Sequence, residues 1–195
     1  MPMIRETLVV TRAAGGCAHI APMGAQLLTL ADGARGVLLQ PFRPSTTLDN
    51  LLTGRCATLN HVDDIRIIAG CLTGRRDWPL LPAGRVAGAR LAAALAHLEL
   101  EVEHVEEDAQ RPRCFLRVVH EATHGPFPGF NRAKAAVLEA AILVSRLHLL
   151  PWDKIDREID YLRIAVDKTA GDEEREAWGW LQEAIAARRP GSGRR

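Results

Sequence analysis

The sequence predicts a mainly β protein with added helices, in which an antiparallel β-barrel is followed by a C-terminal segment of three helices. Up to about residue 128, apolar residues recur at every second position and turn signals separate the runs, as in antiparallel strands. From residue 129 onward, the apolar period becomes that of amphipathic helices. We therefore expect a barrel domain over 1–128, a helical domain over 129–188 and a disordered tail over 189–195.

The first part of the chain predicts six or seven short strands joined by tight turns, which favours a closed barrel. Gly15-Gly16 and Asp32-Gly33 supply two of the hairpin turns, and the third follows Gln110. In 98–103, leucine and valine alternate with three glutamates, so that segment should have one buried and one solvated face. The expected strands are 4–12, 17–23, 27–30, 37–42, 56–60, 98–103 and 114–119.

Helix signals occur at five places. Short helices should begin in 45–47 and after Asp63-Asp64, because Ser, Thr and Asp oxygens accept the free N–H groups of a first turn. Asn131 can cap a helix that ends near Pro151, and Asp172 can cap the last helix. The apolar stripes of the last two helices are Ile155, Ile159, Leu162 and Val166, then Trp178, Leu181 and Ile185.

Composition excludes several classes of protein. The 195 residues carry 25 Lys and Arg against 24 Asp and Glu, a net charge of +1, so there is no overall field to attract nucleic acid or an anionic membrane. Hydrophobic residues make up 47%, which predicts a packed globule. The chain has no apolar run of membrane-spanning length and its start lacks the order of a signal peptide, so we expect a cytoplasmic protein.

Cysteine and histidine patterns give little support for metal chemistry. The four cysteines lie far apart in the sequence and are expected to be small buried residues, with a reactive thiol as the alternative. Residues 120–124 spell His-Glu-x-x-His, the spacing of zinc peptidases, but that site requires a helix. Because 115–119 predicts a strand and Gly125-Pro126 follows, the two histidines should lie about 13 Å apart along a strand. We expect no metal site.

The segment 40–50 predicts an anion site. A strand ends, Arg43 follows, and three hydroxyl residues then open a helix whose first N–H groups carry partial positive charge. An arginine fork matches phosphate geometry, and Ser45, Thr46 and Thr47 can donate further hydrogen bonds. The alternative is an ordinary helix cap beside a solvated arginine.

A second segment, 18–24, suits a flat ligand. Small residues, Pro22 and Gly24 let a planar ring approach the backbone, and the Met23 sulfur can contact an aromatic system. Taken alone, this pattern is typical of many strands.

Together these segments resemble the FMN-binding split β-barrel fold. More closely, the chain resembles a flavoprotein family of methanogenic archaea and methylotrophic bacteria that is linked to tetrahydromethanopterin-dependent one-carbon metabolism. The resemblance covers roughly residues 3–188. It is carried by 4–10, 19–24, 43–51, 58–64, 129–139 and 167–171.

The resemblance implies bound FMN and a homodimer with the flavin near the subunit interface. The phosphate would lie on Arg43, Ser45, Thr46 and Thr47. The isoalloxazine would lie on Ala21, Pro22, Met23 and Gly24, with Asn60 at its polar edge. Asn131 and Arg132 would reach the site or the interface, or serve only as a helix cap and a surface cation. The resemblance supplies no catalytic residue, so we transfer none.

The predicted function is an FMN-binding flavoprotein, with a redox or accessory role in tetrahydromethanopterin-linked one-carbon metabolism. If it is an enzyme, a flavin-dependent oxidoreductase acting on a small molecule such as a pterin is the natural reaction class. The alternatives are a flavin carrier or regulatory binding protein without turnover, and an interaction module without cofactor.

Overall fold

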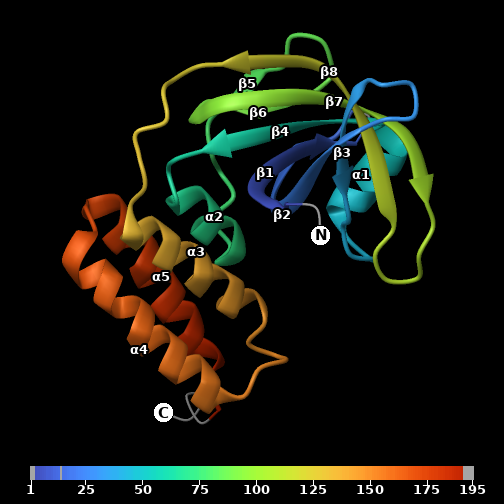
Figure 1. Cartoon of the computed structure of the whole chain (residues 1–195). Helices are drawn as coiled ribbons and strands as arrows, with labels where there is room; N and C mark the ends of the chain where they lie inside the picture. Colours follow the sequence, from blue (N-terminus) through green and yellow to red (C-terminus); the bar gives the residue numbers. More distant parts are fainter. Residues whose placement is uncertain (1–2, 14, 191–195) are drawn as a thin grey trace. The chain divides into compact units, whose positions relative to one another are not determined.

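The first compact unit is a closed antiparallel barrel of six strands in the order β1-β2-β3-β8-β7-β4 (Figure 1). The computed structural model describes residues 3–13 and 15–190. The hairpins expected at Gly15-Gly16 and Asp32-Gly33 are present, with Arg12 opposite Ala18 and Thr29 opposite Arg35. The barrel strands are β1 (Arg5–Arg12), β2 (Ala18–Thr29), β3 (Arg35–Leu39), β4 (Cys56–Val62), β7 (Ala94–Glu106) and β8 (Arg113–Thr123).

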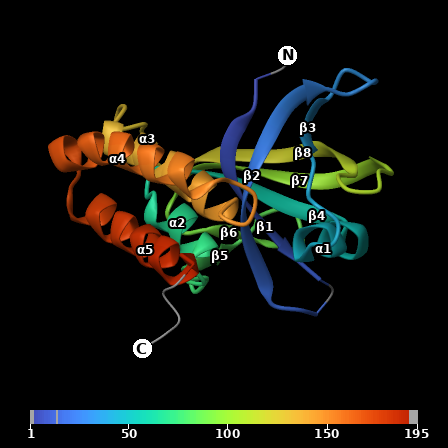
Figure 2. The same ribbon diagram turned by 90° about the horizontal axis from the view of Figure 1, so that it is seen from below.

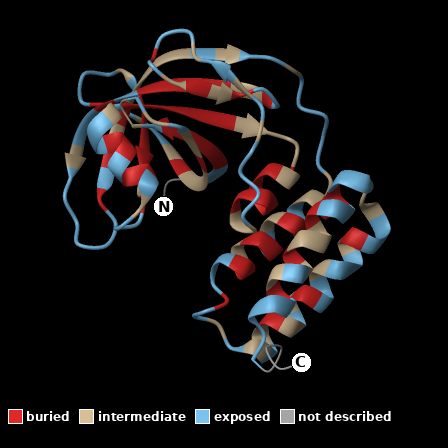
Figure 3. Ribbon diagram, turned by 180° about the vertical axis from the view of Figure 1, so that it is seen from behind, coloured by how far each residue is buried: buried red, intermediate tan, exposed pale blue. Residues whose placement is uncertain are grey.

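The barrel is filled by the apolar residues that the period-2 pattern predicts to point inward. Val37 and Leu39 of β3, Leu59 of β4, and Leu100 of β7 are all completely buried. Helix α1 (Thr46–Gly54) covers one end, where Leu48 and Leu51 join the same core. The buried strand and helix faces are visible in Figure 3. The fold class is therefore confirmed as an antiparallel barrel with C-terminal helices.

A small sheet that the sequence analysis missed covers part of the outside of the barrel. It consists of β5 (Leu80–Pro82) and β6 (Ala89–Leu91), paired antiparallel. Its packing against the barrel corrects one expectation: Glu99, predicted to lie on a solvated face, is completely buried. Glu101 and Glu103, farther along the same strand, are exposed as predicted.

The second compact unit consists of residues 64–77 and 128–195. It contains α2 (Arg66–Leu72), α3 (Arg132–Ser145), α4 (Trp152–Thr169) and α5 (Asp172–Arg188). The last three helices lie alongside one another (Figures 1 and 2). The expected boundaries placed α2 with the barrel, but Arg66 at its start pairs with Glu173 and Glu176 of α5. These contacts, like the packing of α2 on α3 and α5, join that helix to the helical unit.

The helix ends differ from their local signals at three places: α3 ends at Ser145 rather than near Pro151, the N-cap of α2 is Ile65 rather than an aspartate, and the N-cap of α5 has changed. Asn131 caps α3 as predicted, whereas the cap of α5 is Gly171 and not Asp172. The buried stripe of α5 includes Ala177, while Trp178 is half-buried. Of the expected tail, Arg189 forms an ion pair with Asp156, and 191–195 lie outside the described residues.

The described residues, 3–13 and 15–190, show how apolar the helices are and whether the cysteines are paired. None of their helices is both long and apolar enough to cross a bilayer. Cys56, Cys71 and Cys114 are free and buried as predicted, and Cys17 is free but exposed. Burial raises the pKa of the Cys71 thiol to about 11 and that of the Cys114 thiol to about 11, so these two are poor nucleophiles near neutral pH.

Candidate functional site

The predicted phosphate corner joins the end of β3 to the start of α1. The Ser45 Oγ accepts a hydrogen bond from the Leu48 N–H at 3.3 Å, so Ser45 is the N-cap of α1. Its hydroxyl hydrogen stays available for donation, because the cap uses only an oxygen lone pair. The N–H groups of the first helical turn have no partner within a helix. These donors give the corner the chemistry of an anion site.

Arg43 lies in this corner but is paired with an acid. Its Nη2 donates to Glu107 Oε2 at 2.7 Å, and both side chains are substantially exposed. An exposed ion pair of this kind contributes about 0–1 kcal/mol, so a phosphate can compete for the guanidinium. Thr46 is exposed, whereas Thr47 is buried. The corner therefore offers an anion Arg43, Ser45, Thr46 and backbone N–H groups, with Thr47 contributing through the backbone.

The second predicted segment, 21–24, forms the middle of β2 and is half-buried. Met23 packs on the barrel core, so Ala21 shares that inward face while Pro22 and Gly24 point outward. The missing side chain of Gly24 makes room for Ile4, because a Cβ there would lie 2.8 Å from the Ile4 Cγ2 atom. A flat ligand on the outer face would therefore meet Pro22 and the Ile4 side chain that lies against Gly24. Contact between a ring and all four residues stays a prediction.

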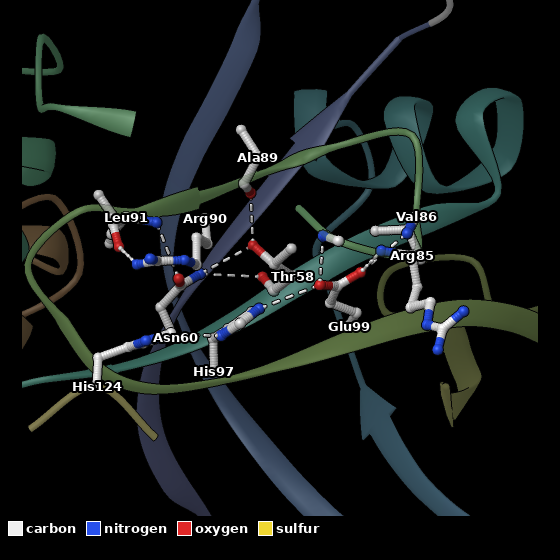
Figure 4. Close-up of polar contacts among 11 residues, drawn as sticks. Thr58, Asn60, Arg85, Val86, Ala89, Arg90, Leu91, His97, Glu99 and His124 are labelled. Atoms are coloured by element: carbon white, nitrogen blue, oxygen red, sulfur yellow. Dashed lines mark hydrogen bonds and ion pairs between the residues drawn. The ribbon is translucent and has the colours of Figure 1, made fainter. Parts of the chain in front are cut away.

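Asn60 is placed differently from the expectation at a flavin edge. It is completely buried beneath the small β5–β6 sheet (Figure 4). Its Nδ2 donates to Leu8 O and to Thr58, and its Oδ1 accepts from the Leu91 N–H at 2.9 Å. Thr58 Oγ1 donates to Ala89 O at 2.7 Å in the same network. In this structure the Asn60 amide holds β6 against β4, and both of its polar atoms are used by the protein.

A buried acid and two histidines form a hydrogen-bonded chain on the same outer face (Figure 4). Glu99 accepts backbone N–H bonds from Gly84, Arg85 and Val86 at 2.6–2.9 Å. His97 Nε2 lies 3.2 Å from Glu99 Oε1, and His97 Nδ1 lies 2.9 Å from the Nε2 atom of the exposed His124. No motif in the sequence predicted this hydrogen-bonded network. Its available signal was the alternation that puts residues 97 and 99 on one strand face.

The pKa values of Glu99 and His124 follow from burial and from the groups around them. Burial alone would raise the pKa of Glu99, but the three N–H donors and His97 outweigh it and lower that pKa to about 2. Burial, then Arg90 and His97, lower the pKa of His124. Glu99 is therefore an anion and His124 a neutral imidazole near neutral pH. The arrangement ties the 84–86 loop to β7 through a buried charge.

The His-Glu-x-x-His segment forms no zinc site of the peptidase type. His120 lies on strand β8 and His124 follows the strand directly, as predicted. Both rings contact His97, at centroid distances of 6.0 Å for His120 and 5.0 Å for His124. Within the part of the chain that the structure describes, no group of three His, Cys, Asp or Glu residues could hold a metal ion.

Asn131 and Arg132 belong to the helical unit, where they lie at the start of α3. Asn131 Oδ1 accepts the N–H groups of Ala133 and Lys134, and its Nδ2 donates to Thr169 O at 3.0 Å. The cap interpretation of Asn131 therefore has direct structural support. Arg132 is exposed beside a hollow between α3 and α4. A role of either residue toward a flavin stays a prediction.

Two family models match consecutive parts of the chain. Residues 5–125 match the model described as "Protein of unknown function (DUF447) N-terminal domain", and 131–183 match the model described as "Protein of unknown function (DUF447)". The chain belongs to the DUF447 family. The two matches meet at the start of α3, close to the change of periodicity in the sequence.

Solved structures share the fold of this DUF447 chain. An FMN-bound DUF447 protein of Methanosarcina mazei is 21% identical with a TM-score of 0.77, covering 94% of this chain and 96% of that one. A 2-nitrobenzoate 2-nitroreductase of Pseudomonas fluorescens is 17% identical with a TM-score of 0.54, covering 64% and 66%. An FMN-binding protein of Thermus thermophilus with bound p-hydroxybenzaldehyde is 18% identical with a TM-score of 0.52, covering 61% and 71%. None of the curated proteins matches the chain.

Proposed function

We propose that this DUF447 chain binds FMN and acts as a flavoprotein. The observation that carries the proposal is the similarity to an FMN-bound member of the same family over 94% of the chain. The corner at the start of α1 supports it, because Arg43, Ser45 and Thr46 offer donors that suit a phosphate. Bound flavin would supply redox chemistry, while the protein would orient the cofactor and set its hydrogen bonds.

The finer proposal is a redox or accessory role in tetrahydromethanopterin-linked one-carbon metabolism, with a pterin as the small-molecule substrate class. It is supported by the family resemblance of the segments around Arg43, Thr58 and Gly129. Anaerobic mixing with NADH or NADPH separates the two forms of this proposal. A rapid loss of the flavin absorption band is expected for a reductase. An unchanged band with both donors would favour a flavin carrier or regulatory binding protein.

The cofactor itself is tested by an absorption spectrum of the purified full-length protein and by mass analysis of the released chromophore. We expect a flavin spectrum, or one that appears on reconstitution, and the mass of FMN. A colourless protein that takes up no FMN after reconstitution would overturn the proposal. Release of another flavin would retain the fold and reject the assignment of the phosphate.

Arg43→Ala tests the phosphate corner. Loss of a charge-assisted contact is expected to weaken FMN binding by about 1.5–3 kcal/mol, roughly ten- to a hundredfold. Arg113→Ala is the matched control, because Arg113 is an exposed arginine that is likewise paired with one glutamate, Glu106. Fluorescence titration of the apoprotein with FMN measures both variants. Equal affinities of the two variants would remove Arg43 from the site.

A further inference from the structure

The end of the barrel away from α1 contains a hollow of about 310 Å³. Helix α1 begins after β3 and ends just before β4, so it closes the end where β3 finishes and β4 starts. The hollow lies at the other end, where β3 and β7 begin and β4 and β8 finish. Its volume is close to the lower limit for small-molecule sites, and barrel mouths are a common place for them. Its lining is Leu27, Arg35, His61, Ala96, His97, Leu98, Glu121, Ala122 and Thr123.

The strand register places the side chains of His61, Glu121 and Thr123 on the inward face, whereas His97 of the same lining lies on the outer face of β7. Leu98 belongs to the barrel core and lies opposite Glu121 in the β7–β8 pairing. Ala96, two residues earlier, lies opposite both His61 and Thr123. Cross-strand partners share a face of the sheet, so these residues point toward the barrel axis. A bulge in β8 opposite Glu99/Leu100 produces this register, because it brings Glu121 rather than His120 to the inward face.

The rim of the hollow carries a cation with unused donors. Arg35 Nη1 donates to Glu121 Oε2 at 2.7 Å, and both side chains are more than half exposed, at 58% and 56%. This single contact leaves the other guanidinium donors free of Glu121. Because the ion pair is exposed, an incoming anion can displace or share it at little cost.

His61 adds an imidazole at the same mouth. It is half-buried, and burial, with Arg5 as the second cause, lowers its pKa. The imidazole is therefore neutral near pH 7 and offers one donor and one acceptor. Leu27, Ala96 and Leu98 supply apolar surface beside these polar groups. Glu121 occupies one guanidinium nitrogen of Arg35, so a ligand that satisfies the remaining donors of Arg35 and His61 has one anionic end and a compact apolar body.

We propose that this hollow is a binding site for a small monocarboxylate, with the carboxylate on Arg35 and His61 and the apolar body on Leu27 and Leu98. A divalent cation is disfavoured by the arginine, and the volume excludes a nucleotide. The site is built from barrel residues other than those of the proposed phosphate corner. The proposal therefore does not rest on flavin binding.

The test is a calorimetric titration of the full-length protein with benzoate, with and without saturating FMN. We expect saturable 1:1 binding that Arg35→Ala and His61→Ala weaken roughly tenfold or more. Arg35→Lys, which keeps the charge but loses the fork, should bind with intermediate affinity. Arg113→Ala and His104→Ala are matched controls, since Arg113 pairs with Glu106 and His104 stacks on Phe115 away from the hollow. Neither control should change the affinity by more than about twofold.

Two further measurements separate a carboxylate site from general apolar binding. Benzyl alcohol, which keeps the ring and lacks the carboxylate, should bind at least about tenfold more weakly. In an NMR titration, benzoate should raise the pKa of His61, because a nearby carboxylate favours the imidazolium. Each of four outcomes would overturn the proposal. They are no binding of benzoate, an equal loss of affinity in the control variants, an equal affinity for benzyl alcohol, and competition between benzoate and FMN. A colourless protein that still binds benzoate would reject only the flavin function.

Discussion

The surroundings of Glu99 give this acidic residue a structural role in the interior instead of a place on the surface. Its carboxylate is buried and accepts three backbone N–H bonds, with His97 as a fourth partner. A buried charge is tolerated only when its hydrogen-bonding capacity is filled, and this carboxylate meets that condition. The Glu99 carboxylate therefore holds the loop that precedes β6 against β7.

Glu99→Gln should lower the free energy of unfolding by roughly 2–4 kcal/mol at pH 7, because an amide cannot satisfy all three N–H donors as an anion does. The pKa of Glu99 is depressed from 4.5 to about 2 in the folded protein. The ionised group therefore stabilises the fold above pH 4.5, and this contribution is lost as the pH falls toward 2. Denaturant unfolding of both proteins at several pH values measures the effect.

Glu101→Gln is the control for this prediction, because Glu101 lies on the same strand and is exposed. It should change the free energy of unfolding by less than about 0.5 kcal/mol. The difference between wild type and Glu99→Gln should shrink between pH 4.5 and 2. A difference that stayed constant over this range, or matched that of Glu101→Gln, would contradict the role of the buried carboxylate.

At the scale of single elements, local signals placed the helices well. The Asn131 side chain accepts two N–H groups of the first turn of α3 and also donates to Thr169 O at the end of α4. One side chain thus caps the start of α3 and binds the end of α4. This double use explains why asparagine suits the position better than aspartate, which can accept the same N–H groups but has no donor for Thr169 O when ionised.

Asn131→Ala should lower the free energy of unfolding by about 1–2 kcal/mol, because both the cap and the bond to α4 are lost. Asn131→Asp should retain the cap and recover part of that loss. Ser145→Ala, an exposed hydroxyl at the other end of α3, is expected to change stability by less than about 0.5 kcal/mol. FMN affinity measured on the same variants tests the alternative: a tenfold loss in Asn131→Asp would give this residue a flavin role.

At the scale of the molecule, the chain forms two compact units with separate cores, a barrel and a helical unit. The net charge of +1 gives little repulsion between copies. The family resemblance implies a homodimer. We therefore expect sedimentation at micromolar concentration to give twice the chain mass of 21.4 kDa. A single species at the mass of one chain would contradict the dimer and leave the barrel fold unaffected.

Much of the local structure of the proposed phosphate corner could be predicted from the sequence. A strand end, an arginine and a run of hydroxyl residues are all local, and the structure places Ser45 at the cap as expected. The sequence could not show that Arg43 is paired with Glu107, because the two residues are 64 positions apart. It also could not show that Thr47 turns into the core, since that depends on how α1 packs on the barrel.

The sequence by itself predicted the strands of the barrel, their hairpin turns and the caps of α1 and α3, because periodicity, glycine turns and caps act between residues close along the chain. Only the tertiary structure decided that Asn60 and Glu99 are buried, because the β5–β6 sheet that covers them predicts no clear period of its own. It also decided that α2 joins the helical unit, through ion pairs of Arg66 with residues more than 100 positions away. Burial and pairing depend on which surfaces meet, and a local pattern carries no information about that.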